Sequence, residues 1–415
     1  MNISKRLLLI GMVATLFATN CADLTIDNLN EPNTKRALSS VADLESLAEN
    51  LYQNFYSDTY DTDTPGSVFA TVADNMTCSW GNYGMRATSS EPRTSWDNTV
   101  SFPYEASTSE FFNEMYAILA SASDVLRAMD NDVDFGSAAT RIEAWSKFNQ
   151  ALVFSNIALT FDQGYIITED TPDAEILNPV LQPASAIAAK AEALFDEVIA
   201  LSASSFTLPE TYINGISGGD NVFLAQLANS YAARLLTYMP RNPAEDANVN
   251  WAKVKTYATN GIDADFMVLM DDTDWLNDYQ WIVAYPGWGR TDMRTISMMD
   301  SSYPSHNAAG ADFAAPDSAT VVDDDTKDNR LLTDFSHLAS NNFRPERGLY
   351  HFSSFRFSRY DDYISTWTTE LPELKKAEVD MLLAEAELQL GNVQAAADIV
   401  NAGTRTTRGG LANVA

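Results

Sequence analysis

The sequence contains little cysteine and little basic charge. Only Cys21 and Cys78 occur in 415 residues, and a chain of this length can bury a sizeable core without a disulfide. Lysine and arginine number 26 against 57 aspartates and glutamates, which gives a net charge of −31. Such a surface repels phosphate backbones and anionic lipid headgroups, so the composition argues against binding to nucleic acid or adsorption to lipid headgroups.

Sequence motifs for catalysis and for metal or phosphate binding are also absent. The histidines His306, His337 and His351 form neither an H-E-x-x-H motif nor a close pair, so we expect no zinc site. No G-x-S-x-G elbow, P-loop or G-x-G-x-x-G motif opens a helix after a strand. The run VVDDDTKDN (321–329) lacks the glycine and distal glutamate of a calcium loop, which favours a solvated acidic turn. We therefore expect no cofactor and no metal.

A long hydrophobic run occurs only at the N-terminus. A basic pair precedes apolar residues 7–17 and small residues follow, which is typical of a secretory signal peptide over residues 1–20. The run is too short to span a bilayer. The cleavage region ends at Cys21 and resembles a lipobox, although positions −3 and −1 depart from the usual Leu and from Gly or Ala. We expect lipidation of Cys21; an ordinary secreted protein and a Cys21–Cys78 disulfide are the alternatives.

Apolar residues at helical spacing predict a series of helices. Each carries apolar side chains three and four residues apart, which form a stripe that faces a core. The predicted helices cover residues 41–57, 109–129, 141–162, 184–202, 221–239, 250–262, 373–390 and 393–402. The last pair is separated by a Gly391-Asn392 stop and is rich in alanine, which allows close antiparallel packing. The pattern indicates an all-α fold of tetratricopeptide-like helical hairpin repeats.

Two long inserts break this pattern, at about residues 58–108 and 265–370. Both are rich in Gly, Pro, Asp, Ser and aromatic residues, and loops of this length usually carry function. Most of the tryptophans lie in them, namely Trp80, Trp96, Trp275, Trp281, Trp288 and Trp367. We therefore expect a lipid-anchored tether over residues 21–40 and then one domain over residues 41–415, with a large irregular, loop-rich subdomain beside the helical scaffold.

Several segments follow one another in an order and spacing that resemble a known family. They are Cys21 with NEPN (30–33), FFNEMYAILASASDVLRAM (111–129), KFNQALVFSNIALTFDQGYI (147–166), FLAQLANSYAARLLTYM (223–239), DNRLLTDF (328–335), KKAEVDMLLAEAELQLGN (375–392) and VNAGTRTTRGGL (400–411). Together they resemble the SusD/RagB nutrient-uptake lipoproteins of Bacteroidetes outer membranes. The second segment departs from the family pattern, with Phe112 at the usual Trp position and Ser123 at the usual Asn position. Family members usually continue further, so we expect the C-terminal end to be truncated.

The resemblance implies a fold, a location and a function. It implies a right-handed stack of four helical hairpins, with an irregular subdomain that carries the ligand site. It also implies a lipoprotein at the cell surface, held to the outer membrane through its N-terminal lipid, which acts as a lid on a SusC-like TonB-dependent transporter. The ligand of such proteins is typically an oligosaccharide, and sometimes a peptide or another nutrient. Binding and delivery, with no catalysis, is the function that it implies.

Aromatic side chains on the inserts are the candidate ligand-binding residues. A flat ring covers the apolar C–H face of a sugar and contributes about 0.5–1.5 kcal/mol, taking aromatic pairs as a guide. The candidates are Trp80, Tyr83, Trp96, Trp275, Tyr279, Trp281 and Trp288, with Arg290 at the rim. Roughly half of the rings are expected instead to hold the inserts on the helices. In LYHFSSFRFSRYDDYISTW (349–367), near alternation predicts a strand or hairpin with one buried face, where packing is favoured over ligand contact.

Two other functions remain open from the residues alone. In a tetratricopeptide-type scaffold for protein partners, the same rings would contact a peptide or the rim of a barrel. A glycan hydrolase would need a pair of carboxylates, which an acidic chain can supply, but no distinctive acid motif supports it.

Overall fold

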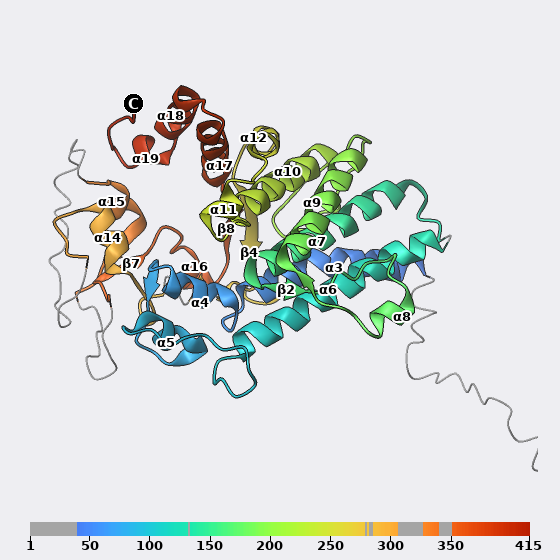
Figure 1. Cartoon of the computed structure of the whole chain (residues 1–415), viewed down its shortest axis with the longest axis horizontal. Helices are drawn as coiled ribbons and strands as arrows, with labels where there is room; N and C mark the ends of the chain where they lie inside the picture. Colours follow the sequence, from blue (N-terminus) through green and yellow to red (C-terminus); the bar gives the residue numbers. More distant parts are fainter. Residues whose placement is uncertain (1–39, 132, 279, 282–284, 306–326, 340–350) are drawn as a thin grey trace, which may run out of the picture.

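The computed structural model describes residues 40–305, 327–339 and 351–415, apart from residues 132, 279 and 282–284 (Figure 1). The predicted signal peptide and Cys21 lie outside the described residues, and so does Tyr279. Within the described part of the chain, no helix combines the length and the apolar character needed to cross a membrane.

A stack of helices forms the scaffold. Its members are α3 (Val41–Tyr60), α6 (Ala106–Asp130), α7 (Ala139–Thr160), α9 (Ala184–Leu201), α10 (Asn221–Tyr238), α12 (Trp251–Thr259), α17 (Lys376–Gln389) and α18 (Val393–Ala402). Each helix in this order packs against the next one (Figure 1). The structure therefore confirms the predicted all-α class, and every predicted helix is present with its ends shifted by a few residues. Periodicity located these helices because each must bury a stripe of its surface.

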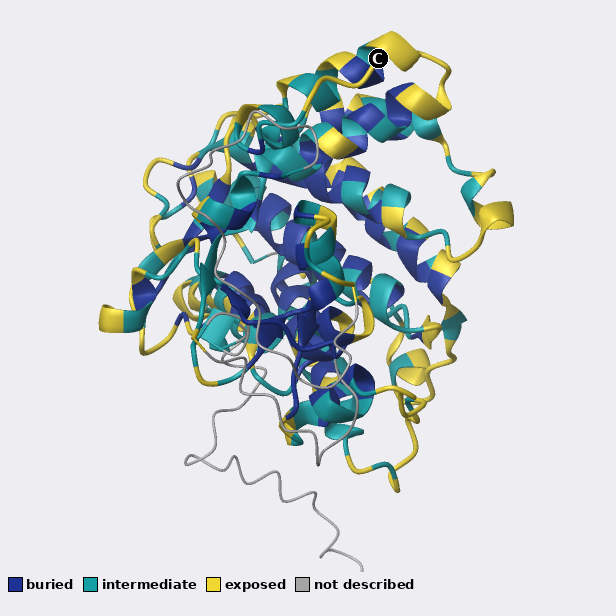
Figure 2. Ribbon diagram, turned by 90° about the vertical axis from the view of Figure 1, so that its left-hand side faces the viewer, coloured by how far each residue is buried: buried dark blue, intermediate teal, exposed yellow. Residues whose placement is uncertain are grey.

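The core of the scaffold surrounds α7. This helix contacts α3, α6, α9 and α10, so it is buried on nearly all sides rather than along one stripe. Buried residues gather in the interior of the helical stack, and exposed ones lie at its periphery (Figure 2). Its Trp145 is fully buried and stacks on Tyr212, with ring centroids 4.9 Å apart. The Trp145 indole Nε1 donates a hydrogen bond to the Ala48 carbonyl at 2.9 Å, which satisfies the one polar atom of the ring.

Side-chain caps fix where several scaffold helices begin. The Ser40 hydroxyl accepts from the backbone N–H of Asp43 at the start of α3, and the Asp220 carboxylate accepts from that of Phe223 at the start of α10. Such caps satisfy N–H groups that have no partner within the helix.

The inserts fold into short helices and strands instead of plain loops. The first contains α4 (Pro65–Val72), β1 (Met76–Thr77), the 3₁₀ turn Asn82–Gly84 and α5 (Met85–Ser89). The second contains β4 (Phe266–Met270), β5 (Arg290–Thr291), α14 (Met293–Met299), α15 (Arg330–Asp334), β6 (Phe335–His337), β7 (Phe355–Phe357), α16 (Tyr363–Thr366) and β8 (Thr369–Leu374). Elsewhere lie β2 (Gln163–Gly164), α8 (Asp173–Ile176), β3 (Gln182–Pro183), α11 (Pro243–Asp246), α19 (Thr404–Thr407) and the 3₁₀ turn Gly136–Ala138.

Antiparallel strand pairs hold the inserts together. The pair β1–β5, in which Thr77 faces Arg290, joins the first insert to the second. The pair β4–β8 joins the two ends of the second insert, and β6 pairs with β7. β7 confirms the predicted strand, but Phe355 and the neighbouring Arg356 are both buried, so burial is not confined to one face. The strand is shorter than the alternating pattern, and α16 follows it.

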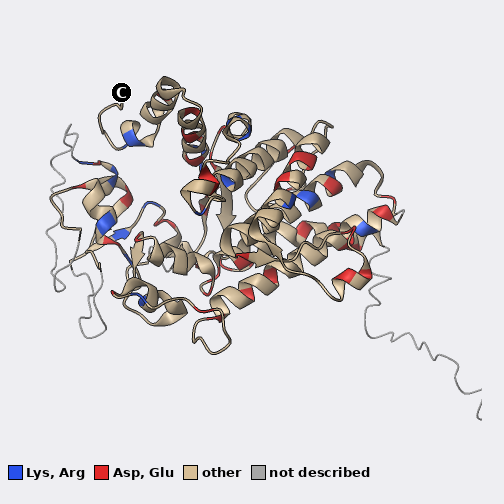
Figure 3. Ribbon diagram, in the orientation of Figure 1, with Lys and Arg blue, Asp and Glu red and all other residues tan. Residues whose placement is uncertain are grey.

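The inserts have small hydrophobic cores of their own, separate from the core of the scaffold. Met76, Cys78 and Met85 form one, and Met270, Tyr363 and Leu371 form another. Charge is also distributed unevenly, because acidic residues are spread along the scaffold helices while several basic residues lie around α14, α15 and α19 (Figure 3). The inserts therefore form a distinct subdomain, in which buried and charged residues from distant segments meet.

Candidate ligand-binding site

Aromatic rings from distant segments gather on the insert subdomain. They are Trp80, Trp281, Tyr285, Trp288 and Trp367, and we call them the aromatic cluster. The Trp281 ring is central, with its centroid 5.0 Å from that of Trp288, 6.1 Å from Tyr285 and 6.4 Å from Trp367. Trp80 extends the cluster on the other side of Trp288, and the centroids of these two rings lie 6.1 Å apart. These are separations at which aromatic rings contact and stabilise one another.

Local backbone turns bring the central rings together. The Tyr285 N–H donates to the Trp281 carbonyl at 3.0 Å, and the Trp288 N–H donates to the Tyr285 carbonyl at 3.3 Å. Pro286 and Gly287 occupy the second turn, where a fixed φ and a small residue favour a tight reversal. The two turns place three large rings on neighbouring parts of one short segment.

The cluster is supported on one side and open on the other. Trp80 is 40 % exposed and Trp367 is 38 % exposed, whereas Trp281 is half-buried against the small core of Met76, Cys78 and Met85. The fully buried Tyr363 ring lies 5.6 Å from that of Trp367 and supports it from below. The arrangement presents large apolar rings to solvent while their inner faces are fixed by packing.

Two aromatic residues of this region have a backbone in the left-handed conformation. Trp367 has φ 54° and Tyr83 has φ 53°, values that cost a residue with a side chain about 1–2 kcal/mol. Tyr83 packs on the same small core as Trp281. Strained positions of this kind persist only where the surroundings impose them, and they cluster at binding sites.

The structure places the predicted ligand-binding rings in different environments. Trp80, Trp281 and Trp288 lie in the aromatic cluster, and Tyr83 lies beside it. Trp96 instead packs edge-on against Phe102 with centroids 5.0 Å apart. Its indole Nε1 donates to the Asn98 side chain at 2.9 Å. Its contacts are within the first insert, as expected of a ring that holds the insert in place.

The position of Trp275 corrects its assignment to the ligand site. This ring is only 7 % exposed and lies in the scaffold core, 5.6 Å from the Tyr56 ring and 6.3 Å from the Tyr52 ring. The Asp271 carboxylate accepts hydrogen bonds from three successive backbone N–H groups, ending with that of Trp275 at 3.0 Å. This turn folds the ring back onto α3, so Trp275 anchors the second insert.

The position of Arg290 corrects its assignment to the rim. Its side chain is 1 % exposed, and its guanidinium carbon lies 5.8 Å above the Phe352 ring. Burial, with the nearby charge of Arg356, lowers the pKa of Arg290 to about 10. Arg290 lies on β5, and this strand pairs with β1 inside the subdomain. The side chain is therefore buried instead of lying at the rim.

Tyr285 and Trp367 are members of the cluster that the sequence analysis did not select. Their rings are nearly parallel, 6.3 Å apart at 22°. The turn residues after Tyr285 were a usable signal, because they mark a place where a ring can be held at the surface. Nothing near Trp367 in the sequence marks it, since its partners come from another segment.

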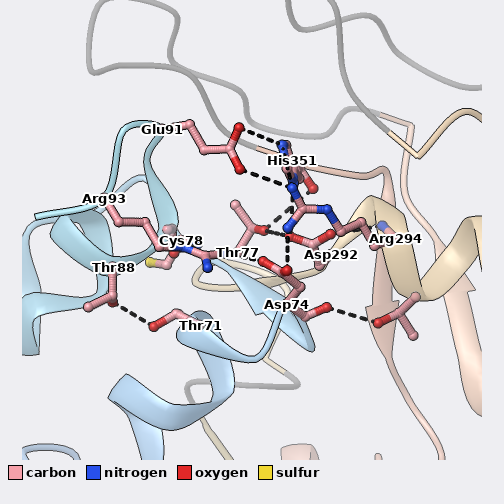
Figure 4. A network of polar contacts seen from close by, with 12 residues as sticks. Thr71, Asp74, Thr77, Cys78, Thr88, Glu91, Arg93, Asp292, Arg294 and His351 are labelled. Atoms are coloured by element: carbon pink, nitrogen blue, oxygen red, sulfur yellow. Dashed lines mark hydrogen bonds and ion pairs between the residues drawn. The ribbon is translucent and has the colours of Figure 1, made fainter.

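A charged network joins the two inserts (Figure 4). Asp74, in the left-handed conformation with φ 57°, pairs with both Arg93 and Arg294. Arg294 also reaches Glu91 at 3.0 Å, and the Nε2 atom of His351 lies 3.4 Å from the same carboxylate. The first insert is thereby tied to α14.

The same network contains a group with the spacing of metal ligands. One ligand atom each from Asp74, Asp292 and His351 lies within 4.8 Å of the others. Asp292 is 2 % exposed and accepts from the Thr77 hydroxyl at 2.6 Å, and burial raises the pKa of its carboxyl. Two arginines already neutralise Asp74, so the group serves as a structural link between β1 and α14 rather than as an open metal site.

Comparison with known proteins identifies the fold. No model of a known protein family matches the chain, and no curated protein sequence matches it either. Among solved structures, a SusD-like carbohydrate binding protein from Bacteroides vulgatus is similar at a TM-score of 0.59 and 16 % identity, covering 91 % of this chain and 77 % of its own. A SusD-like carbohydrate binding protein from Bacteroides fragilis gives 0.60 and 12 %, covering 91 % and 80 %.

A third structural neighbour is named for the ligand that it binds. It is a laminarin binding SusD-like protein, similar at a TM-score of 0.51 and 16 % identity, covering 90 % of this chain and 85 % of its own. These similarities extend over most of each chain, so this protein has the SusD-like fold, as the resemblance of its sequence segments implied.

Proposed function

We propose that this protein binds oligosaccharides at the cell surface through the aromatic cluster and catalyses no reaction. One observation carries the proposal: large rings from separate segments converge on a supported surface that remains open to solvent. Neighbours with the same fold bind carbohydrate, one of them laminarin, which supports a glycan as the ligand.

The composition of the cluster suits reversible capture. Each ring that covers a sugar face contributes about 0.5–1.5 kcal/mol, so a few rings give weak to moderate affinity. Such affinity allows a ligand to be held and then passed on. Because the rings also pack on one another, little side-chain freedom is lost when the ligand binds.

The proposal extends to anchoring and delivery. We propose that Cys21 carries the lipid that holds the protein on the outer membrane, and that a SusC-like TonB-dependent transporter receives the ligand. The expected outcome for Cys21→Ala is release of the protein from the membrane fraction with unchanged glycan binding. A variant that stays in the membrane fraction would refute the anchor. Co-purification of a barrel protein with the wild-type chain tests the partner.

Binding and catalysis are separated by one set of measurements on purified protein. We expect retention on some members of an immobilised glycan panel that includes laminarin, and no release of reducing sugar from the glycans that bind. Trp281→Ala should weaken retention, while Trp96→Ala, a change of the same size in a ring that packs elsewhere, should not. Release of reducing sugar would favour the alternative of a glycan hydrolase.

One feature favours a second function, a scaffold for protein partners. A cavity of about 480 Å³ lies among α9, α10 and α12, and no residue of the aromatic cluster lines it. Its walls include Ala188, Leu236, Met239 and Val249, which would suit the apolar side chains of a peptide. If this function holds, Met239→Glu should abolish capture of a protein partner and leave glycan retention unchanged. Capture that depends on Trp281 instead would place the partner on the aromatic cluster.

A further inference from the structure

A second cavity lies inside the insert subdomain, between the β1–β5 pair and the β6–β7 hairpin. Its volume is about 200 Å³, and its walls include Asn75, Met76, Arg290, Thr295 and Phe357. This space exceeds what a single water molecule occupies and is large enough for a small organic molecule. With Thr291 and Phe335, the walls combine one cation, three uncharged polar residues and three apolar ones.

Arg290 is a buried cation without an acidic partner among the described residues. Its side chain is 1 % exposed, and its Nη1 atom donates only to the carbonyl of Gly289, the preceding residue, at 2.9 Å. Its Nε atom is buried and has no hydrogen-bond partner. A charge removed from water is strongly unfavourable unless it is paired and hydrogen-bonded.

Other arginines of the subdomain differ from Arg290 in this respect. Arg294 pairs with Asp74 and Arg356 with Asp361, each through a charged hydrogen bond. Burial, and then the like charge of Arg356, lowers the pKa of Arg290. A pKa of about 10 still leaves Arg290 protonated at neutral pH, so the cation needs a counter-charge.

We propose that this cavity binds the carboxylate group of a small organic acid or of an acidic sugar, with Arg290 as its cationic partner. A planar guanidinium donates two parallel hydrogen bonds to a carboxylate, a geometry that a spherical ion does not use. Met76 and Phe357 provide apolar walls for the carbon skeleton, and the Asn75 amide provides hydrogen bonds for hydroxyl groups. The Thr295 hydroxyl donates to the Asp74 carbonyl at 3.0 Å, so it serves a ligand hydroxyl as an acceptor. The inference stands on Arg290 and is independent of glycan binding at the aromatic cluster.

An anion needs a cation in its binding site, because the overall charge of the chain opposes anion binding. The chain carries −31, so an anion approaches against a repulsive field and binds only where a cation is built into the structure. Selectivity for an acid over its neutral analogue follows, since only the acid supplies the counter-charge to Arg290. The carboxylate belongs either to a free organic acid or to an acidic sugar unit within an oligosaccharide.

The test measures binding of sodium glucuronate to the purified protein by calorimetry and thermal unfolding, at constant ionic strength. Glucuronate should bind and raise the melting temperature, and glucose, its neutral analogue, should do neither. Arg290→Gln should weaken glucuronate binding by about tenfold or more, because a charge-assisted hydrogen-bonded pair is lost. Arg86→Gln, which changes an arginine of the first insert, is the control and should bind as the wild type does.

A measurement on the wild-type chain keeps the test independent of how the variant folds. In protein labelled with ¹⁵N-arginine, the Nε–H signal of Arg290 should shift on addition of glucuronate and not on addition of glucose or sodium chloride. An oligosaccharide containing uronic acid that binds more tightly than free glucuronate would identify the acidic sugar as the source, and equal or weaker binding would identify the free acid. No shift with glucuronate, or the same shift with chloride, would overturn the proposal.

Discussion

Trp367 combines a strained backbone with a partly exposed ring. Its φ of 54° is a conformation that glycine adopts at no steric cost, yet a tryptophan occupies it and contacts both Trp281 and Tyr285. The contacts of the ring offset the cost of the strained backbone. The effects of ring and backbone are separable, because two substitutions remove the same ring but differ in backbone strain.

Trp367→Ala and Trp367→Gly should weaken glycan binding equally, because both remove the ring. Trp367→Gly should be more stable to urea unfolding than Trp367→Ala by about 1 kcal/mol, since glycine relieves the left-handed strain. Equal stability of the two variants would show that the backbone at this residue is not strained.

Asp58 should make stability depend on pH. Burial, with the charges of Glu114 and Asp61, raises the pKa of Asp58 to about 7 from a usual value near 4. Between these two values the folded chain holds a proton that the unfolded chain has released, so stability contributed by Asp58 falls as pH rises through this window. Above it, Asp58→Asn should stabilise the protein by about 1–2 kcal/mol, after allowance for solvent screening at a partly exposed group.

The measurement is urea unfolding of the wild type and of Asp58→Asn at a series of pH values. The stability difference should be small in acid and should grow up to about pH 7, then level off. A difference that does not change with pH would contradict the raised pKa.

At the scale of residues, the sequence predicted which types of residue form the aromatic cluster better than where each one lies. Trp281 and Trp288 are in the cluster as expected, because a turn-rich segment cannot bury three neighbouring rings in one core. Trp275 could not be separated from them, because its burial depends on how Asp271 folds a turn. Trp367 was missed, because its partners are contributed by a different part of the chain.

The scaffold helices depend on close approach at a few backbone positions. Gly261 follows α12 and lies against α10 and α17, where an added Cβ would come within 2.7 Å of the Ser230 Oγ and 2.9 Å of a Val379 methyl carbon. The Ser230 hydroxyl also accepts a hydrogen bond from the Ile262 N–H at 2.9 Å, so it is not free to move away. The contact leaves no space for a side chain.

Gly261→Ala should therefore destabilise the protein by about 1–3 kcal/mol in urea unfolding, the usual cost of overpacking. Gly287→Ala is the matched control, because a Cβ there would meet only the Tyr285 ring at an ordinary 3.7 Å. A loss for Gly261→Ala no larger than that of the control would contradict the packing described here.

Among elements, helices were predictable and short strands were not. Helices such as α9 show their apolar stripe within one segment. A strand of two residues such as β1 has no pattern of its own, and it exists because Met76 pairs with Thr291. The inserts therefore appeared loop-rich in the sequence, although they contain paired strands and small cores.

For the whole molecule, the charge of −31 should make stability depend on salt. Self-repulsion weakens as ions screen the surface charges, so the melting temperature should rise as sodium chloride increases from low to physiological ionic strength. Binding of a neutral glycan should change little over the same range, because ring contacts are not charged. A melting temperature that stays constant or falls would show that the acidic surface is already neutralised locally.

The most direct test of the central claim is calorimetric titration of the triple variant Trp281→Ala, Trp288→Ala, Trp367→Ala with a glycan that binds the wild type. Three lost rings should weaken binding by roughly ten- to a thousandfold, with the circular dichroism of the scaffold unchanged. Trp96→Ala should bind as the wild type does. Wild-type affinity in the folded triple variant would contradict the account and move the ligand site away from the aromatic cluster.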